Sequence, residues 1–299
     1  MGWIVYLITG AALLMGVLSV ALFRQRARLE DARSLAETLV GCRALLGLIL
    51  HFQQHRGMSS AWLAGDLSFA SKLAGQARDI DALFHAVGPV ARSESCRHHP
   101  CMTPNALTLF RHRWATLRER LPGLTVEQSI TQHTTLIEQL LQWLAALGEA
   151  RIESTLDQEV SRCLARNYTS RLPALTECLG QARAVGMSVA TRQSCSAVAR
   201  VRLVFLIARA ETLLTQALAG GQGSVRAETA SRAVEQMAQL VRGRLLPSSG
   251  VSVTAQDYFN GATQAVDAVF AWIFESAQAV ANSELQTRRD IVPLAMAGQ

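Results

Sequence analysis

Lysine is almost absent from this 299-residue chain: Lys72 is the only one, and arginine supplies the other positive side chains. The net charge of +6 is modest and scattered. Because no run of basic residues marks a nucleic-acid-binding surface, we expect no nucleic-acid partner. An anion that binds here is expected to meet planar, forked guanidinium donors rather than ammonium groups.

Strand patterns and catalytic motifs are missing as well. No segment alternates apolar and polar residues for long enough to predict a β-strand. Aromatic residues make up only 6% of the chain, whereas alanine, leucine, glutamine, arginine and valine are abundant and favour helices. Since no nucleophile–base pair stands out, we predict neither an enzyme nor a bound cofactor.

Cysteine occurs six times, but not at the dense spacing of a disulfide framework. We expect reduced thiols. The segment CRHHPC holds two cysteines and two histidines within residues 96–101, a spacing too tight for one tetrahedral zinc site. We therefore predict a solvated loop there and no metal.

One long uncharged run is present, WIVYLITGAALLMGVLSVALF at residues 3–23. Its 21 residues are enough for a helix to cross a hydrocarbon core of about 30 Å. The run lacks the basic n-region of a cleaved signal peptide. Arg24, Arg26 and Arg28 follow it, and positive charge marks the cytoplasmic side. We predict a single-pass membrane anchor with the remainder in the cytoplasm.

Helical periodicity predicts helices throughout the rest of the chain. We expect the membrane helix to continue without a break to about residue 64, followed by helices at 67–87, 105–121, 130–147, 153–166, 172–192, 195–218, 226–246 and 255–288. Residues 88–104 are predicted to form a loop. Thr125 stands three residues before Gln128, which is the pattern of a capping box.

The predicted fold class is all-α, with an N-terminal transmembrane helix followed by two antiparallel four-helix bundles. We divide the chain into an anchor at 1–24, a helical domain at 25–290 and a tail at 291–299. Within the domain, the two bundles are expected at about 25–150 and 151–290.

Two arginines lie where apolar side chains are expected. Arg56 shares a helical stripe with Leu45, Ile49, Phe52, Ser59 and Leu63. Arg183 shares a second stripe with Leu172, Thr176, Leu179, Gly186 and Ala190. A guanidinium is expensive to bury without a counter-charge, so each position needs an explanation.

Two explanations are open from the residues alone. Small neighbours leave room for a ligand, and Ser59 and Ser60 add hydroxyl donors, so two guanidinium groups facing one cavity would suit a small planar oxyanion. Alternatively, each arginine pairs with a buried carboxylate, for which Asp81 and Asp267 are the candidates.

Five stretches occur in the order of a known family: LILHFQQHRGMSSAWLAG, KLAGQARDIDALF, LTVEQSITQHTTLIEQLL, LTECLGQARAVGMSVA and DYFNGATQAVDAVF. They cover roughly residues 40–275, and each resembles a segment of the nitrate- and nitrite-sensing (NIT) domain of bacterial signalling proteins. The resemblance implies an all-helical fold of two four-helix bundles that bind nitrate or nitrite between them through arginines.

By motif, the ligand-binding positions are Arg56 in HRG and Arg183 in GQARA. A further arginine occurs later in the family, and Arg242 or Arg244 is the candidate here. The chain departs from the family pattern at His55, Ala182 and His133, where an acidic residue, a glutamate and a tyrosine are usual. These departures leave the identity of the ligand open.

The predicted function is therefore a sensor domain, anchored in the bacterial inner membrane, that binds nitrate or nitrite for signal transduction. Family members usually carry an output module after this domain, and no such motif follows residue 290. We expect the signal to pass through a homodimer, a separate signalling partner or the membrane helix. The alternative is a helical, membrane-anchored scaffold or interaction domain without a small-molecule ligand.

Overall fold

Every regular element in the described part of the chain is helical, which confirms the all-α class. The computed structural model describes the backbone of residues 2–156, 158–220 and 223–291, and side chains within these ranges from residue 15 to residue 282, except 17, 27–29 and 31–32. The helices are α1 Gly2–Leu63, α2 Ala70–Ser95, α3 Pro104–Arg120, α4 Val126–Leu147, α5 Glu159–Arg166, α6 Leu172–Arg192, α7 Ala197–Ala219, α8 Val225–Leu240 and α9 Ala255–Ile291. Short 3₁₀ segments are η1 Leu67–Phe69, η2 Leu121–Gly123 and η4 Glu153–Thr155, and π-helical segments are η3 Gly148–Ile152, η5 Asn167–Arg171 and η6 Val241–Leu245.

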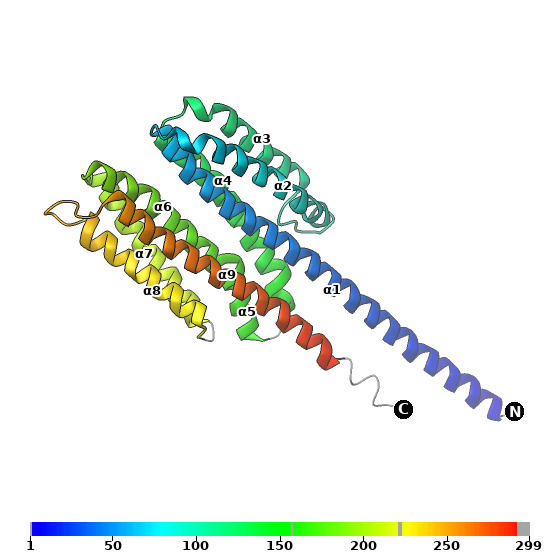
Figure 1. Ribbon diagram of the computed structural model, residues 1–299. Helices are drawn as coiled ribbons and strands as arrows, with labels where there is room; N and C mark the ends of the chain where they lie inside the picture. The colour runs from blue at the N-terminus through cyan, green and yellow to red at the C-terminus, as the bar shows by residue number, and fades with distance from the viewer. Residues whose placement is uncertain (1, 157, 221–222, 292–299) are drawn as a thin grey trace.

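The helices pack into two groups that lie side by side (Figure 1). In the first group, α1 packs along α2 and α4, and α3 contacts α2 and α4. In the second group, α6 packs along α7 and α9, and α8 contacts α9 and α7. Helices α1 and α4 both contact α6, so these three helices join the groups.

Helix α1 is unbroken over its 62 residues, as the sequence predicts. Its N-terminal part projects beyond the packed helices, whereas its C-terminal part lies among them (Figure 1). The segment Arg33–Leu63 is long and apolar enough to cross a membrane, but more than half of its most apolar window is buried inside the protein. We interpret it as a core helix. The predicted anchor at 3–23 is described as helical backbone, and the side chains of residues 2–14 lie outside the described part.

The prediction of a loop from residue 88 was wrong at its start, because α2 continues through Pro89 to Ser95. The last turns of α2 bury Val90 and Glu94. The Glu94 carboxylate lies 2.8 Å from the guanidinium of Arg151. Burial and this ion pair offset the helical hydrogen bond that Pro89 cannot donate.

Local signals placed most of the other helix ends correctly. The capping box at Thr125 is confirmed: its hydroxyl accepts from the Gln128 amide, and the Gln128 side chain accepts from the Thr125 amide. The helix predicted from residue 153 begins only at Glu159, because a π-helical and a 3₁₀ turn come first. The three π-helical segments were not predicted.

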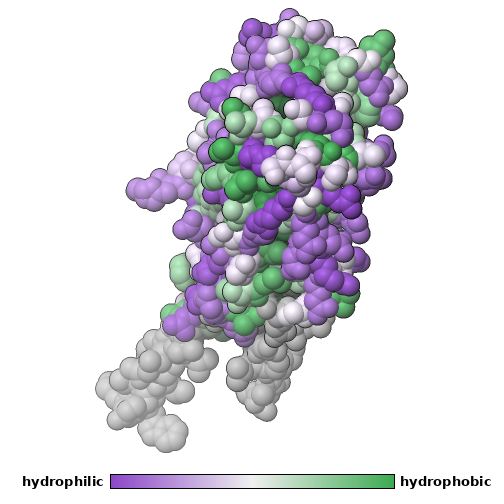
Figure 2. Space-filling view, turned by 90° about the vertical axis from the view of Figure 1, so that its left-hand side faces the viewer, coloured by the Kyte–Doolittle hydropathy of each residue, from purple (hydrophilic) through white to green (hydrophobic). Residues whose placement is uncertain are grey.

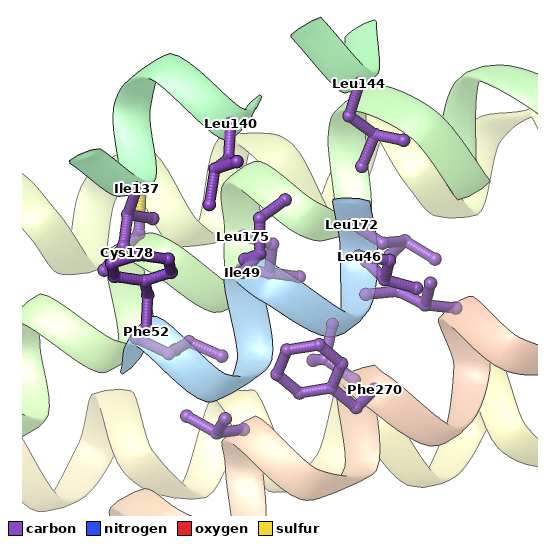
Figure 3. Packing of buried hydrophobic residues seen from close by; sticks show 14 of the residues in the cluster. Leu46, Ile49, Phe52, Ile137, Leu140, Leu144, Leu172, Leu175, Cys178 and Phe270 are labelled. Carbon is purple, nitrogen blue, oxygen red and sulfur yellow. The ribbon is translucent and has the colours of Figure 1, made fainter. Parts of the chain in front are cut away.

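An apolar layer joins the two groups of helices (Figure 3). Its side chains are Leu46, Ile49 and Phe52 from α1, Ile137, Leu140 and Leu144 from α4, Leu172, Leu175 and Cys178 from α6, and Phe270 from α9. All are buried, and each large aliphatic or aromatic side chain contributes about 1.5–3 kcal/mol by leaving water. The layer therefore holds α1 and α4 against α6 and α9.

A buried histidine pair lies between α1 and α4. His133 donates from Nδ1 to the carbonyl of Ser129 at 2.7 Å, so its Nε2 accepts from His55 Nδ1 at 2.8 Å. Burial, with the neighbouring positive side chains, lowers the pKa of His55 to about 3 and that of His133 to about 4. Both rings are therefore neutral at pH 7.

Helix α9 approaches α6 closely at Gly186. The ring of the buried Tyr258 lies where a β-carbon would be, because an added Cβ at Gly186 would come within 2.2 Å of it. The Tyr258 hydroxyl donates to the carbonyl of Ala182 at 2.7 Å. This contact sets the distance between the two helices that carry Arg183 and Thr263.

Apolar side chains also reach the surface. On the face drawn in Figure 2 they form several patches between polar residues. The projecting part of α1 exposes Met15 and Phe23, and the outer face of α7 exposes Val198, Val201 and Phe205.

We expect Gly186→Ala to lower the free energy of unfolding by about 1–3 kcal/mol, since the new methyl group would overlap a buried ring. Urea denaturation followed by circular dichroism measures the change. Gly57→Ala is the control: this exposed position inside α1 has no neighbouring atom within 4 Å of an added Cβ. It should be neutral or stabilise by up to about 1 kcal/mol. Equal losses in both variants would contradict the close packing of α6 and α9.

Acid should weaken the fold before its carboxylates titrate. The pKa values of His55 and His133 are lowered in the folded state, so below pH 6.5 the unfolded chain binds more protons and stability falls as pH falls. Between pH 7 and pH 5 the loss is about 2 kcal/mol per histidine. Urea titrations across this window should show that His133→Gln reduces the slope and that His112→Gln, at an exposed position, leaves it unchanged. A wild-type stability that is flat from pH 7 to pH 5 would contradict a neutral buried pair.

Candidate anion-binding site

Arg56 is only 2% exposed and pairs with a carboxylate. Its Nη1 lies 2.6 Å from Oε1 of Glu177, and its Nη2 donates to Oε2 of the same carboxylate at 3.2 Å. The pair joins α1 to α6 and so connects the two groups of helices. For Arg56, a buried carboxylate partner is therefore present, but it is neither of the two aspartates considered from the sequence.

Neither aspartate forms an ion pair with Arg56 or Arg183. Asp81 accepts from Arg118 at 2.6 Å and from the indole nitrogen of Trp114 at 3.0 Å. Asp267 is exposed on α9 and acts on Arg183 only as a charge nearby, without an ion pair.

The carboxylate of Glu177 is surrounded by donors. Besides Arg56, it accepts from the side-chain amide of Gln53 at 3.0 Å and from that of Gln181 at 2.9 Å. Charge-assisted hydrogen bonds of this kind offset the cost of removing a carboxylate from water. Gly180 adds a steric condition, because a β-carbon there would lie 2.9 Å from Nη2 of Arg56.

Arg183 differs from Arg56 in having no counter-ion. It is half-buried on α6, donates from Nη1 to the hydroxyl of Thr263 on α9 at 3.1 Å, and lies over the ring of Phe259. Among the described residues, no carboxylate lies within 4.0 Å of its guanidinium. Burial, followed by the positive charge of Arg56, lowers its pKa. The two arginines are thus close enough to repel each other electrostatically.

The two candidate serines both make contacts within α1. The hydroxyl of the buried Ser59 lies 3.1 Å from Nδ1 of His55, which carries the proton that the pair requires. Because this proton is donated to His133, Ser59 accepts it only as a second, longer partner, and its own hydroxyl proton can be donated to another acceptor. Ser60 instead donates to the carbonyl of Arg56 at 2.9 Å.

The later arginines are on the surface. Arg242 is exposed and donates from Nη2 to Glu211 at 2.6 Å. Arg244 is exposed and donates to the carbonyl of Ser252 at 3.3 Å. Arg56 and Arg183 therefore lie close enough to interact electrostatically, whereas Arg242 and Arg244 bond to Glu211 and Ser252.

Sequence reasoning missed Glu177, Gln53 and Thr263. One signal was available: Glu177 is the only charged residue between Leu172 and Arg183, in a segment that reads as a buried helix. Gln53 also lies one helical turn before Arg56, on the same face.

The four helices of the apolar layer also supply this polar cluster. Its members are Gln53 and Arg56 from α1, Thr134 from α4, Glu177 and Arg183 from α6, and Thr263 from α9. The arrangement offers guanidinium, amide and hydroxyl donors, which can hold a small oxyanion without covalent chemistry.

Comparison with known proteins bears on the same region. The family model described as "Nitrate and nitrite sensing" (NIT) matches residues 47–286, a range that includes Arg56, Arg183 and most of the helices. No curated protein matches the chain.

Among solved structures, the chain is similar to the NasR transcription antiterminator, with a TM-score of 0.68 and 18% sequence identity. The alignment covers 93% of this chain and 77% of that one. At this identity the likeness shows a shared fold. The match of the family model over most of the chain shows more: the chain belongs to the nitrate- and nitrite-sensing (NIT) family.

Proposed function

We propose that this protein is a membrane-anchored sensor that binds nitrate or nitrite between Arg56 and Arg183. The observation that carries the proposal is the half-buried guanidinium of Arg183, which has no carboxylate partner among the described residues and lies near a second, buried arginine. An unpaired cation in such a place favours an anion from solution. Membership of the NIT family favours nitrate or nitrite as that anion.

In the proposed site, Arg183 and Thr263 hold the anion from the second group of helices, and Arg56 faces it from the first. Ser59 adds a hydroxyl from α1. Ser60, Arg242 and Arg244 are left out, because their donors are engaged elsewhere.

We further propose that the two groups of helices act as two antiparallel four-helix bundles, at about 25–150 and 151–290. An anion held between them binds one packing of the bundles more tightly than others and thereby shifts the equilibrium towards it. Because Arg56 and the projecting part of α1 belong to one helix, the shift would reach the membrane helix, a homodimer or a separate signalling partner.

The proposed anchor is the segment 3–23 of α1. Its described side chains are exposed, with 70% exposure at Met15 and 75% at Phe23, which is expensive in water and favourable in a hydrocarbon core. Arg24, Arg26 and Arg28 would then lie on the cytoplasmic side of a bacterial inner membrane.

The alternative function is a membrane-anchored interaction domain without a small ligand. The exposed apolar face of α7, with 79% exposure at Val198 and 60% at Phe205, is the observation that favours it. Anion titration separates the two functions.

Calorimetric titration of the detergent-solubilised full chain should show heat of binding with nitrate or nitrite and a weaker or absent response to chloride. Arg183→Ala should weaken this binding at least tenfold, about 1.4 kcal/mol, because it removes the unpaired cation. It should leave the melting temperature nearly unchanged, since Arg183 has no ion pair to lose.

Arg162→Ala is the matched control, because this partly exposed arginine pairs with Glu159 on α5, and its binding should equal that of the wild type. Arg56→Ala is a poorer test, since it leaves Glu177 buried without its partner and should cost about 3–5 kcal/mol of stability. Absence of binding, or an equal response to nitrate, nitrite and chloride, would contradict the proposed ligand.

Replacing Leu14 and Leu18 together by arginine should release the chain from membranes, since each arginine near the middle of a span costs roughly 2.5–3.5 kcal/mol. Carbonate extraction followed by immunoblotting measures the membrane fraction. Val40→Arg, on the same helix but outside the proposed span, should stay in the membrane fraction. Digestion of the helical domain by protease added outside spheroplasts would overturn the proposed orientation.

A further inference from the structure

The charges buried around Arg56 do not cancel. Arg56 and Glu177 neutralise each other through two hydrogen bonds at 2.6 and 3.2 Å, whereas Arg183 keeps its charge. The nearby His55 and His133 are neutral because burial lowers their pKa values. Asp267 is exposed, so water screens its charge. Among the described buried and half-buried residues of the cluster, one uncompensated positive charge is therefore left, that of Arg183.

Glu177 determines how many positive charges remain uncompensated, because it is the partner of Arg56. Its side chain is 5% exposed and accepts from Arg56, Gln53 and Gln181, so three donor side chains hold the carboxylate in place. Without its carboxylate, Arg56 and Arg183 together would present two uncompensated charges to a ligand.

Gln53 holds the carboxylate of Glu177 from the other group of helices. Its side-chain amide nitrogen donates to Thr176 at 3.4 Å and to Glu177 at 3.0 Å, both on α6. Its amide oxygen is buried and has no partner among the described residues. Because that oxygen can only accept hydrogen bonds, the donors of the proposed anion site are those of Arg56, Arg183 and Thr263.

We propose that Glu177 is a specificity-determining residue of the anion site: by neutralising Arg56 it leaves one charge, so that the site selects a monovalent oxyanion over a divalent one. This inference rests on the proposed function. Nitrate or nitrite cancels the single charge of Arg183, whereas sulfate would bring a second negative charge next to the buried carboxylate.

Three forms of the full-length protein test this selection, each titrated with sodium nitrate and sodium sulfate at constant ionic strength. The wild type should prefer nitrate. Glu177→Gln keeps the shape of the side chain but raises the local charge by one, so sulfate should bind at least tenfold more tightly than to the wild type, and the ratio of nitrate to sulfate affinity should fall. The double variant Arg56→Gln with Glu177→Gln restores a single charge and should restore the preference for nitrate.

Glu159→Gln is the control, because this exposed glutamate on α5 lies outside the cluster and should leave the ratio unchanged. A Glu177→Gln variant with the wild-type ratio would overturn the inference, as would a double variant that binds sulfate as Glu177→Gln does. If one of these two results is obtained but the wild type binds nitrate, the inference fails and the proposed function still stands. If the wild type binds neither anion, the proposed function fails, and the gain of sulfate binding in Glu177→Gln alone decides the inference.

Loss of the carboxylate leaves Arg56 buried without a counter-ion, so Glu177→Gln should be less stable than the wild type. Its melting temperature should then rise with sulfate by more than that of the wild type, because a ligand that binds only the folded state stabilises it. An equal rise in both proteins would count against the role of Glu177.

Discussion

The ion pair between Arg56 and Glu177 is the contact on which the joining of the two helix groups depends. Apolar burial holds α1 and α4 against α6, but it is non-directional and fixes the relative position of the helices less sharply than a polar contact does. A bidentate pair is directional, and the side chains of Arg56 and Glu177 are 2% and 5% exposed. A shift of the helices that breaks the pair therefore leaves two buried charges without partners. The register between α1 and α6 is therefore set by this pair, and Gly180 gives it the necessary room.

The apolar layer and the polar cluster are two parts of one arrangement. Each of the four joining helices supplies both, and its polar residue lies between one and seven positions from its apolar one. The pairs are Phe52 and Arg56, Ile137 and Thr134, Cys178 and Glu177, and Phe270 and Thr263. A change in the cluster must then move helices that are also packed in the layer. Since packed interiors resist gradual deformation, such a change favours a switch between discrete arrangements.

The sequence reveals the helices and half of the candidate site. Periodicity and capping are local properties, so the bounds of α6 and the capping box of α4 agree with prediction, although α4 begins at Val126 rather than at residue 130. The extension of α2 through Pro89 depends on Glu94 meeting Arg151, which lies 57 residues further along. In the same way, Arg56 is recognisable as a charge on an apolar stripe, whereas its partner Glu177 is 121 residues away and is selected by how α1 meets α6. A single sequence does not show which distant carboxylate pairs with Arg56, and it offered no reason to prefer Glu177 over Asp81 or Asp267.

Helix α1 connects the proposed anion site to the proposed membrane anchor. It contains no proline between Gly2 and Leu63, and its hydrogen bonds run without a break. At 1.5 Å per residue, Arg56 and the arginines that follow the proposed anchor are about 48 Å apart along one rod. A tilt or rotation of α1 against α6 would therefore be passed along the helix to the proposed anchor, whereas a flexible connection would absorb it. The size of the response is limited by energy rather than distance, because an anion can shift the packing only by as much as its affinities for the two arrangements differ.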